Sequence, residues 1–148
     1  MQKRMKLILF ALIVLFIVYE VSYPHFNEKR YYKEINHYIS STAVVKNIIY
    51  SSSQSIVIWI DEADEAYNHG GELIWYPTFE IKGESVAYAL ENGIEQKLQI
   101  GDEIIFTSAP EIFYNGHALP IVHLEVNGEV LLPFEEGYEN LMDLYLFG

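Results

Sequence analysis

The chain has 148 residues, enough for about one domain, and its 51% hydrophobic and 20% charged residues indicate a globular rather than a disordered protein. Acidic residues outnumber basic ones 21 to 9, and the absence of cysteine excludes a disulfide framework, a thiol nucleophile and any Cys-ligated metal site. The length also excludes a (β/α)8 barrel, which needs about 250 residues.

The first element in the chain is an apolar segment. Residues 1–6 form a basic flank, and residues 7–19 are an unbroken apolar run. That run alone covers about 20 Å, less than the hydrocarbon core of a bilayer. Read as 5–23, with tyrosines at the interface, the segment is just long enough to cross. We therefore predict a transmembrane signal anchor at 7–23.

Two alternatives to the anchor remain, a cleaved signal peptide and a buried core helix. The residues after the apolar run are bulky or charged where an A-x-A-like cleavage site needs small side chains. Basic residues on both sides give only a slight bias toward an N-terminus inside the cytoplasm. We accordingly expect the C-terminal domain outside the cytoplasm.

Residues 24–41 are expected to form a juxtamembrane helix or stalk. Pro24 ends the apolar segment, because proline interrupts helical hydrogen bonding. Aromatic and branched residues at helical spacing then predict a helix over about 27–39. Two glutamates offset the bases here, so packing against the domain is favoured over a basic helix on the membrane surface.

From residue 42 to 148 the sequence predicts an acidic β domain. Short segments rich in branched and aromatic residues are expected as strands, at 42–50, 56–60, 73–81, 86–90, 104–106, 120–126 and 129–133. Asn-Gly pairs, which tolerate the positive φ angles of tight hairpins, occur at Asn92-Gly93, Asn115-Gly116 and Asn127-Gly128. A short closing helix is expected at 138–147.

These elements predict a mainly β fold, a small OB-like barrel or sandwich. It follows the N-terminal transmembrane helix and carries a short juxtamembrane helix and a short C-terminal helix. A sheet this small is expected to curl, because open edges invite pairing with other chains.

Two motifs carry a resemblance to known domains. They read Tyr76-Pro77-x-Phe79-x-x-x-Gly83 and Leu98-x-Ile100-Gly101-Asp102-x-Ile104. This pattern resembles small membrane-tethered β domains of bacteria whose function is uncharacterised, and the Gly-Asp step is similar to strand entries of OB-like barrels. The resemblance covers about residues 42–108. It implies a barrel beside a membrane and no catalytic residues.

The most polar segment runs from residue 61 to 71. The candidate metal ligands in it are Asp61, Asp64, Glu65 and His69. Carboxylate oxygens suit calcium, and histidine with carboxylates suits zinc or manganese. The spacing does not match a calcium-binding loop, so a solvated turn is the simpler interpretation. We predict no cofactor.

Charge also limits the partners of the domain. Residues 35–148 hold three lysines and 18 acidic residues, a net charge of −15. Phosphate recognition depends on arginine and lysine, so no nucleic acid partner is expected. The expected partners are the membrane, through residues 7–23, and another membrane or envelope protein.

Three functions fit these features. The first is a membrane-anchored, extracytoplasmic interaction or accessory domain with no chemistry of its own. The second is a sugar- or peptide-binding module that uses exposed aromatic residues, with core packing as their alternative role. The third is a hydrolase that uses carboxylates, with or without a metal, although no catalytic motif supports it. The candidate binding residues are Trp59, Trp75, Tyr76, Phe113 and Tyr114.

Overall fold

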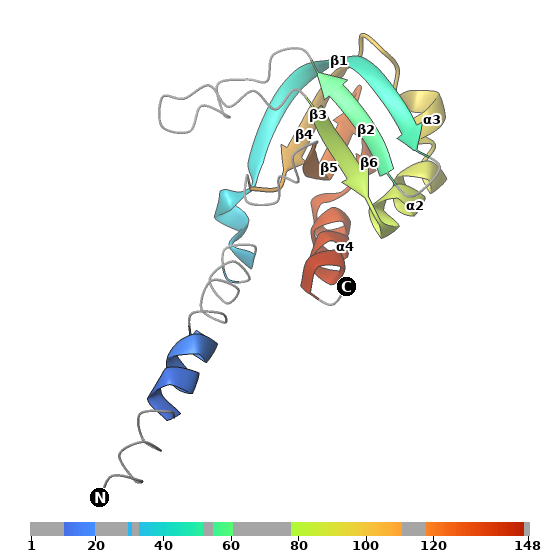
Figure 1. The fold of residues 1–148 in the computed structure, drawn as a ribbon. Helices are drawn as coiled ribbons and strands as arrows, with labels where there is room; N and C mark the ends of the chain where they lie inside the picture. Colours follow the sequence, from blue (N-terminus) through green and yellow to red (C-terminus); the bar gives the residue numbers. More distant parts are fainter. Residues whose placement is uncertain are drawn as a thin grey trace, which may run out of the picture. The chain divides into compact units, whose positions relative to one another are not determined.

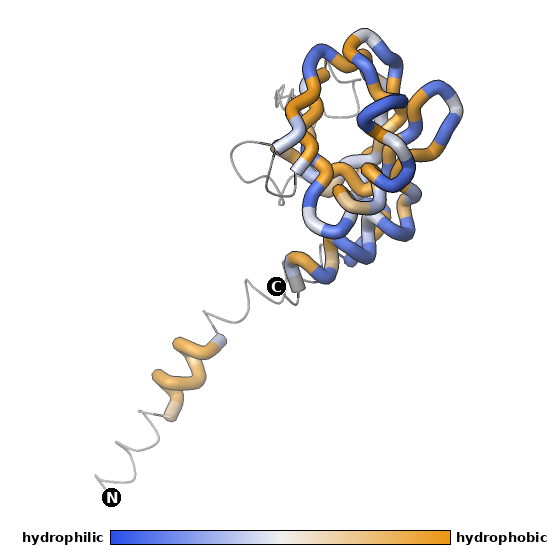
Figure 2. Tube along the Cα trace, turned by 90° about the vertical axis from the view of Figure 1, so that its right-hand side faces the viewer, coloured by the Kyte–Doolittle hydropathy of each residue, from blue (hydrophilic) through white to orange (hydrophobic). Residues whose placement is uncertain are grey.

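The computed structural model describes residues 11–19, 30, 33–51, 55–60, 78–110 and 118–146. The chain divides into two compact units, Met1–Lys33 and Glu34–Gly148. In the first unit residues 11–19 form a helix that is apolar throughout (Figure 2), and its side chains are exposed. Among the described residues no helix is both long and apolar enough to cross a membrane. The anchor at 7–23 extends beyond them and stays a prediction.

The second unit is mainly β, as the sequence predicts. Its described elements are η1 (Ile35–His37), β1 (Ile39–Ser51), β2 (Ser55–Ile60), β3 (Thr78–Lys82), α2 (Glu84–Glu91), α3 (Ile94–Lys97), β4 (Glu103–Ser108), β5 (Leu119–Val126), β6 (Glu129–Leu132) and α4 (Phe134–Leu146). The strands form one sheet.

The sheet closes on itself. Its order is β3-β2-β1-β4-β5-β6, and an additional pairing joins β3 to β5 (Figure 1). All neighbouring strands are antiparallel except β3 and β5, which are parallel and pair Phe79 with Leu119. The hydrogen bonds therefore run in a ring through β1, β2, β3, β5 and β4, with β6 added beside β5.

A long, bent first strand makes this closure possible. The first part of β1 pairs with β4 and the second with β2, so one strand serves both halves of the ring. A bulge lies between Val45 and Asn47, where the register with β2 shifts. Bulges bend a strand and increase its twist, and β1 curves visibly around the ring (Figure 1).

The core lies inside the ring. Phe79 and Phe106 are completely buried, and their ring centroids are 4.7 Å apart in an edge-to-face arrangement. The other large side chains with almost no exposed surface are Val45, Ile56, Ile58, Ile81, Ile94, Ile104, Leu119, Leu124, Leu131 and Leu132. Every strand contributes to this list, so the alternation of apolar residues sets the inner face of the sheet.

The strand predicted at 86–90 is wrong, because these residues belong to α2. Gly83, with φ +56°, turns the chain out of β3 immediately before the helix. The buried residues of α2 are Ser85, Val86 and Ala89, which follow helical spacing. The apparent alternation of larger residues at 86, 88 and 90 does not match the face that packs.

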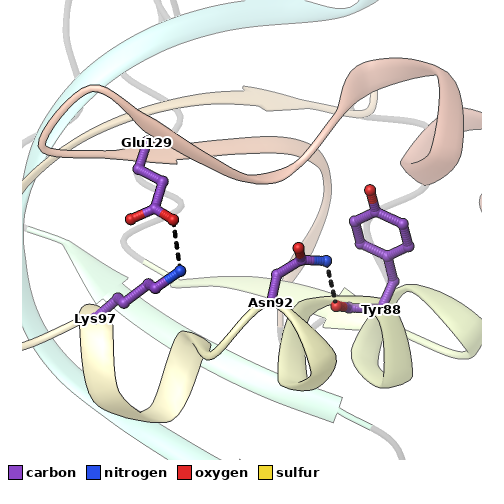
Figure 3. A network of polar contacts seen from close by, with 4 residues as sticks. All are labelled: Tyr88, Asn92, Lys97 and Glu129. Atoms are coloured by element: carbon purple, nitrogen blue, oxygen red, sulfur yellow. Dashed lines mark hydrogen bonds and ion pairs between the residues drawn. The ribbon is translucent and has the colours of Figure 1, made fainter.

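Asn92-Gly93 is also not a hairpin. Asn92 ends α2, and its side-chain amide donates a hydrogen bond to the carbonyl of Tyr88 at 2.9 Å (Figure 3). Gly93, with φ +79°, turns directly into α3. The same dipeptide chemistry that suits a hairpin also ends a helix, since both need a residue that tolerates positive φ.

The hairpin predicted at Asn127-Gly128 is confirmed. Asn127 has φ +52° and Gly128 φ +80°, and they connect β5 to β6. Positive φ at both central residues is the requirement of the tight turn that matches strand twist. The remaining pair, Asn115-Gly116, lies outside the described residues.

Two element ends differ from expectation. Residues 30 and 33 are helical, but the expected helix does not reach residue 39. Ile35–His37 form the short η1, and β1 begins at Ile39, which pairs with Ser108. The C-terminal helix is confirmed, but α4 begins at Phe134, four residues before the predicted start.

An aromatic cluster joins the start of β1 to α4. The ring of Tyr38 meets those of Phe134 and Tyr138 edge-on, at centroid distances of 5.8 and 5.5 Å. Phe134 and Tyr138 stack on each other at 5.7 Å. Tyr38 is buried by these contacts, which fix the first turn of α4 against the start of β1.

Tyr38→Phe should make the protein less sensitive to alkali. Burial, with a smaller effect of Tyr138, raises the pKa of Tyr38 above its usual 10.0. The stabilisation is therefore complete below about pH 10 and is lost as the pH rises toward the folded-state pKa. We expect a change below about 1 kcal/mol at pH 7 and a smaller loss of stability above about pH 10. Urea unfolding at both pH values measures this, and an unchanged alkaline loss would contradict it.

Candidate functional site

The outer face of β2 presents an exposed tryptophan. Alternate residues of this strand are buried at Ile56, Ile58 and Ile60, and the residues between them point outward. Trp59 is 42% exposed, and its cross-strand partners are Asn47 on β1 and Thr78 on β3. An indole of this size on the outer face of the sheet provides a flat surface for stacking.

Two aliphatic residues extend this surface. Ile49, on β1, is 46% exposed and pairs directly with the half-buried Val57 of β2. The bulge at Lys46 matters here, because one extra residue turns Asn47 and Ile49 to the same side as Trp59. We call Ile49, Val57 and Trp59 the β2 face.

Of the five predicted binding residues, only Trp59 belongs to the part of the chain that the structure describes. Trp75, Tyr76, Phe113 and Tyr114 lie outside it. Among the described residues, Thr78 pairs with Trp59 and Leu119 pairs with Phe79. The prediction that these four aromatics bind a ligand remains untested.

The acidic segment at residues 61–71 also lies outside the described residues. Asp61, Asp64, Glu65 and His69 lie outside the described residues, so a metal site and a solvated turn both stay predictions for this segment. Within residues 33–51, 55–60, 78–110 and 118–146, no group of three or more histidine, aspartate or glutamate side chains is arranged to hold a metal ion.

The structure reveals a buried ion pair that the sequence did not predict. Lys82 Nζ lies 2.6 Å from Glu80 Oε1, and their side chains are only 17% and 9% exposed. The same Nζ donates a hydrogen bond to Tyr145 Oη on α4 at 3.5 Å. Strand alternation places Glu80 and Lys82 on one outer face, but a sequence gives no sign that this part of the face is covered.

The charge of Lys82 is stabilised in this setting. Burial lowers the pKa of Lys82, but the hydrogen bond and charge of Glu80, together with Tyr145, outweigh it and raise the pKa above 10.5. Lys82 therefore stays an ammonium at neutral pH. Its contacts connect β3 to the last turn of α4, which is a structural role.

Polar side chains also form a row across β1, β4 and β5. Ser40 pairs with Thr107, and their hydroxyl oxygens are 2.8 Å apart. Thr107 pairs in turn with the half-buried His123, whose Nδ1 is buried and has no hydrogen-bond partner among the described residues. No hydrogen bond joins Thr107 to His123 there, so this row lacks the hydroxyl–imidazole contact of an activated nucleophile.

Comparison with protein-family models, curated proteins and solved structures found no significant match to this chain. Residue roles cannot therefore be transferred to Trp59, Glu80 or His123 from a relative. Their chemistry follows only from burial, pairing and exposure, and by these criteria the β2 face is the surface best suited to a ligand.

Proposed function

We propose that this chain is an interaction domain attached to a membrane by its N-terminal segment. The helix at 11–19 supports attachment, because eight consecutive large apolar side chains, from Leu12 to Tyr19, are all at least 43% exposed. A helix that is apolar on every side needs a protein core or a lipid phase around it. The adjoining sequence, from residue 5 to 23, has the length to cross a bilayer.

The intact protein should fractionate with membranes and resist a high-salt wash, because burial of these side chains in lipid does not depend on charge. Replacing Leu15 and Phe16 together with lysine should release it, since a charge in the middle of a membrane segment costs about 3 kcal/mol. A mature form that begins near Tyr23, or a wild-type protein that remains in the supernatant, would contradict the anchor.

We further propose that the domain is an OB-like barrel. The ring order β1-β2-β3-β5-β4, its parallel β3–β5 closure and the position of α2 and α3 between β3 and β4 support this assignment. Barrels of this kind bind oligosaccharides or oligonucleotides on the face of their second and third strands. The net charge of −15 over residues 35–148 argues against nucleic acid.

The observation that carries the function is the exposure of Trp59 on this face. A half-exposed tryptophan beside Ile49 and Val57 suits an uncharged ligand that stacks, such as a neutral sugar or an apolar peptide side chain. We also propose that the domain lies outside the cytoplasm. If its ligand is part of another envelope protein, that protein would bind at the β2 face.

Trp59→Ala should weaken ligand binding by about 2 kcal/mol, because truncated aromatic anchors produce losses of this size. Leu90→Ala on α2 is the matched control, since Leu90 is 41% exposed but belongs to a helix and not to the strands β1, β2 or β3. Titration with neutral oligosaccharides and with uncharged aromatic peptides measures the affinity. Equal losses in the two variants would contradict a site at Trp59.

In a Trp75→Phe variant the remaining tryptophan reports on the face directly. Its fluorescence should be quenched by acrylamide in the free protein and protected when ligand binds. A tryptophan that is inaccessible to acrylamide from the start would mean that Trp59 is covered and is not a binding residue.

A further inference from the structure

A second exposed surface lies on the outer side of β4 and its neighbours. Ile105 of β4 pairs with Thr42 on β1 and with Glu125 on β5, and Glu125 pairs with Val130 on β6. On the adjacent row Val44 pairs with Glu103. We call Val44, Glu103, Ile105, Glu125 and Val130 the β4 face.

The apolar members of this face are uncovered. Val44, Ile105 and Val130 are 39%, 43% and 45% exposed, whereas Ile104 and Phe106, the neighbours of Ile105 in the strand, are completely buried. Exposed branched side chains from three strands of one sheet are typical of a surface that binds another protein.

The charge of the β4 face comes from its two carboxylates, Glu103 and Glu125. Glu103 and Glu125 make no ion pair with any described residue, whereas the other barrel acids Glu80 and Glu129 do. Lys97 is paired with Glu129, at 2.5 Å (Figure 3), and Lys82 with Glu80. These two lysines are therefore paired with other carboxylates and do not neutralise Glu103 or Glu125.

We propose that the β4 face binds a protein segment in which apolar side chains alternate with lysine or arginine. Apolar residues of the partner would cover Val44, Ile105 and Val130, and its bases would pair with Glu103 and Glu125. A second copy of this chain is disfavoured, because it would bring two sets of unpaired carboxylates together. The proposal uses neither Trp59 nor the membrane segment, so it stands or falls separately from the proposed function.

The test uses the full chain in an uncharged detergent and a short synthetic peptide of alternating valine and lysine. Ile105→Ser combined with Glu125→Gln should weaken binding about tenfold. Val44→Ser combined with Glu103→Gln, on neighbouring strands, should do the same. A peptide of alternating valine and glutamate should not bind.

The matched control is Leu90→Ser combined with Glu91→Gln on α2. Both residues are exposed, so this variant loses the same charge and a similar apolar surface. Its affinity should stay within about twofold of wild type. Equal losses in the control and in the β4-face variants would show a general attraction to an acidic protein and overturn the proposal, as would wild-type affinity in both β4-face variants.

Discussion

Gly137→Ala should destabilise the protein by about 3 kcal/mol, even though this change in a helix interior is ordinarily stabilising by roughly 1 kcal/mol. A Cβ at position 137 would lie 2.6 Å from the carbonyl carbon of Val122 and 2.7 Å from its Cα, and would overlap the carbonyl oxygen. These are backbone atoms of β5, a strand paired with both β4 and β6. Neither α4 nor β5 can move without losing packing or hydrogen bonds.

Urea denaturation measures the change in stability. Its sign shows whether the clash with β5 or the higher helix propensity of alanine has the larger effect. Glu139→Ala, at an exposed site two residues along the same helix, is the control and should change stability by less than about 0.5 kcal/mol. A Gly137→Ala protein that is more stable than wild type would show that helix propensity outweighs the contact, and that α4 does not sit directly on β5.

Glu80→Ala should cost about 3 kcal/mol, because it leaves the Lys82 ammonium largely buried without its carboxylate. The double variant Glu80→Leu, Lys82→Met removes both charges and should lie within about 1 kcal/mol of wild type. Chemical denaturation at pH 7 compares them. If the double variant is as unstable as the single one, lost packing rather than an unpaired charge explains the effect.

A second ion pair of the same type provides the control. Lys97 and Glu129 also lie within hydrogen-bonding distance, but their side chains are 40% and 59% exposed. Glu129→Ala should therefore cost less than about 1 kcal/mol.

The cost of Glu80→Ala should also depend on pH. The raised pKa of Lys82 makes the stabilisation complete below about pH 10.5, and it is lost as the pH rises further. The difference between wild type and Glu80→Ala should consequently shrink in alkali. A difference that grows with pH would contradict the assigned charge of Lys82.

Most strands of the domain could be predicted because their signals are local. β2 alternates buried isoleucines with outward residues, and Asn127-Gly128 supplies two positive φ angles at the turn between β5 and β6. Such patterns depend only on neighbouring residues. The same local signal was ambiguous at 86–90, where residues alternate in size but Ser85, Val86 and Ala89 pack as a helical face.

The candidate site was predictable only in part. Aromatic content identified Trp59, but the sequence did not distinguish an exposed indole from a core one. The bulge that brings Ile49 beside it is a register shift between two strands. The β4 face and the Glu80–Lys82 pair combine residues whose exposure depends on what packs over them, and no spacing along the chain encodes that.

By itself the sequence determined the acidic charge, the apolar N-terminal segment, the mainly β composition and the inner face of most strands, because these follow from residue type and short-range periodicity. Only the tertiary structure decided how the sheet closes. Phe79 and Leu119 lie 40 positions apart but pair in parallel. Tyr145 of α4 contacts the largely buried Lys82 of β3, whereas Trp59 stays exposed. The physical reason is that a residue becomes buried only when strands and helices from distant parts of the chain pack together, so its burial cannot be read from the segment that contains it.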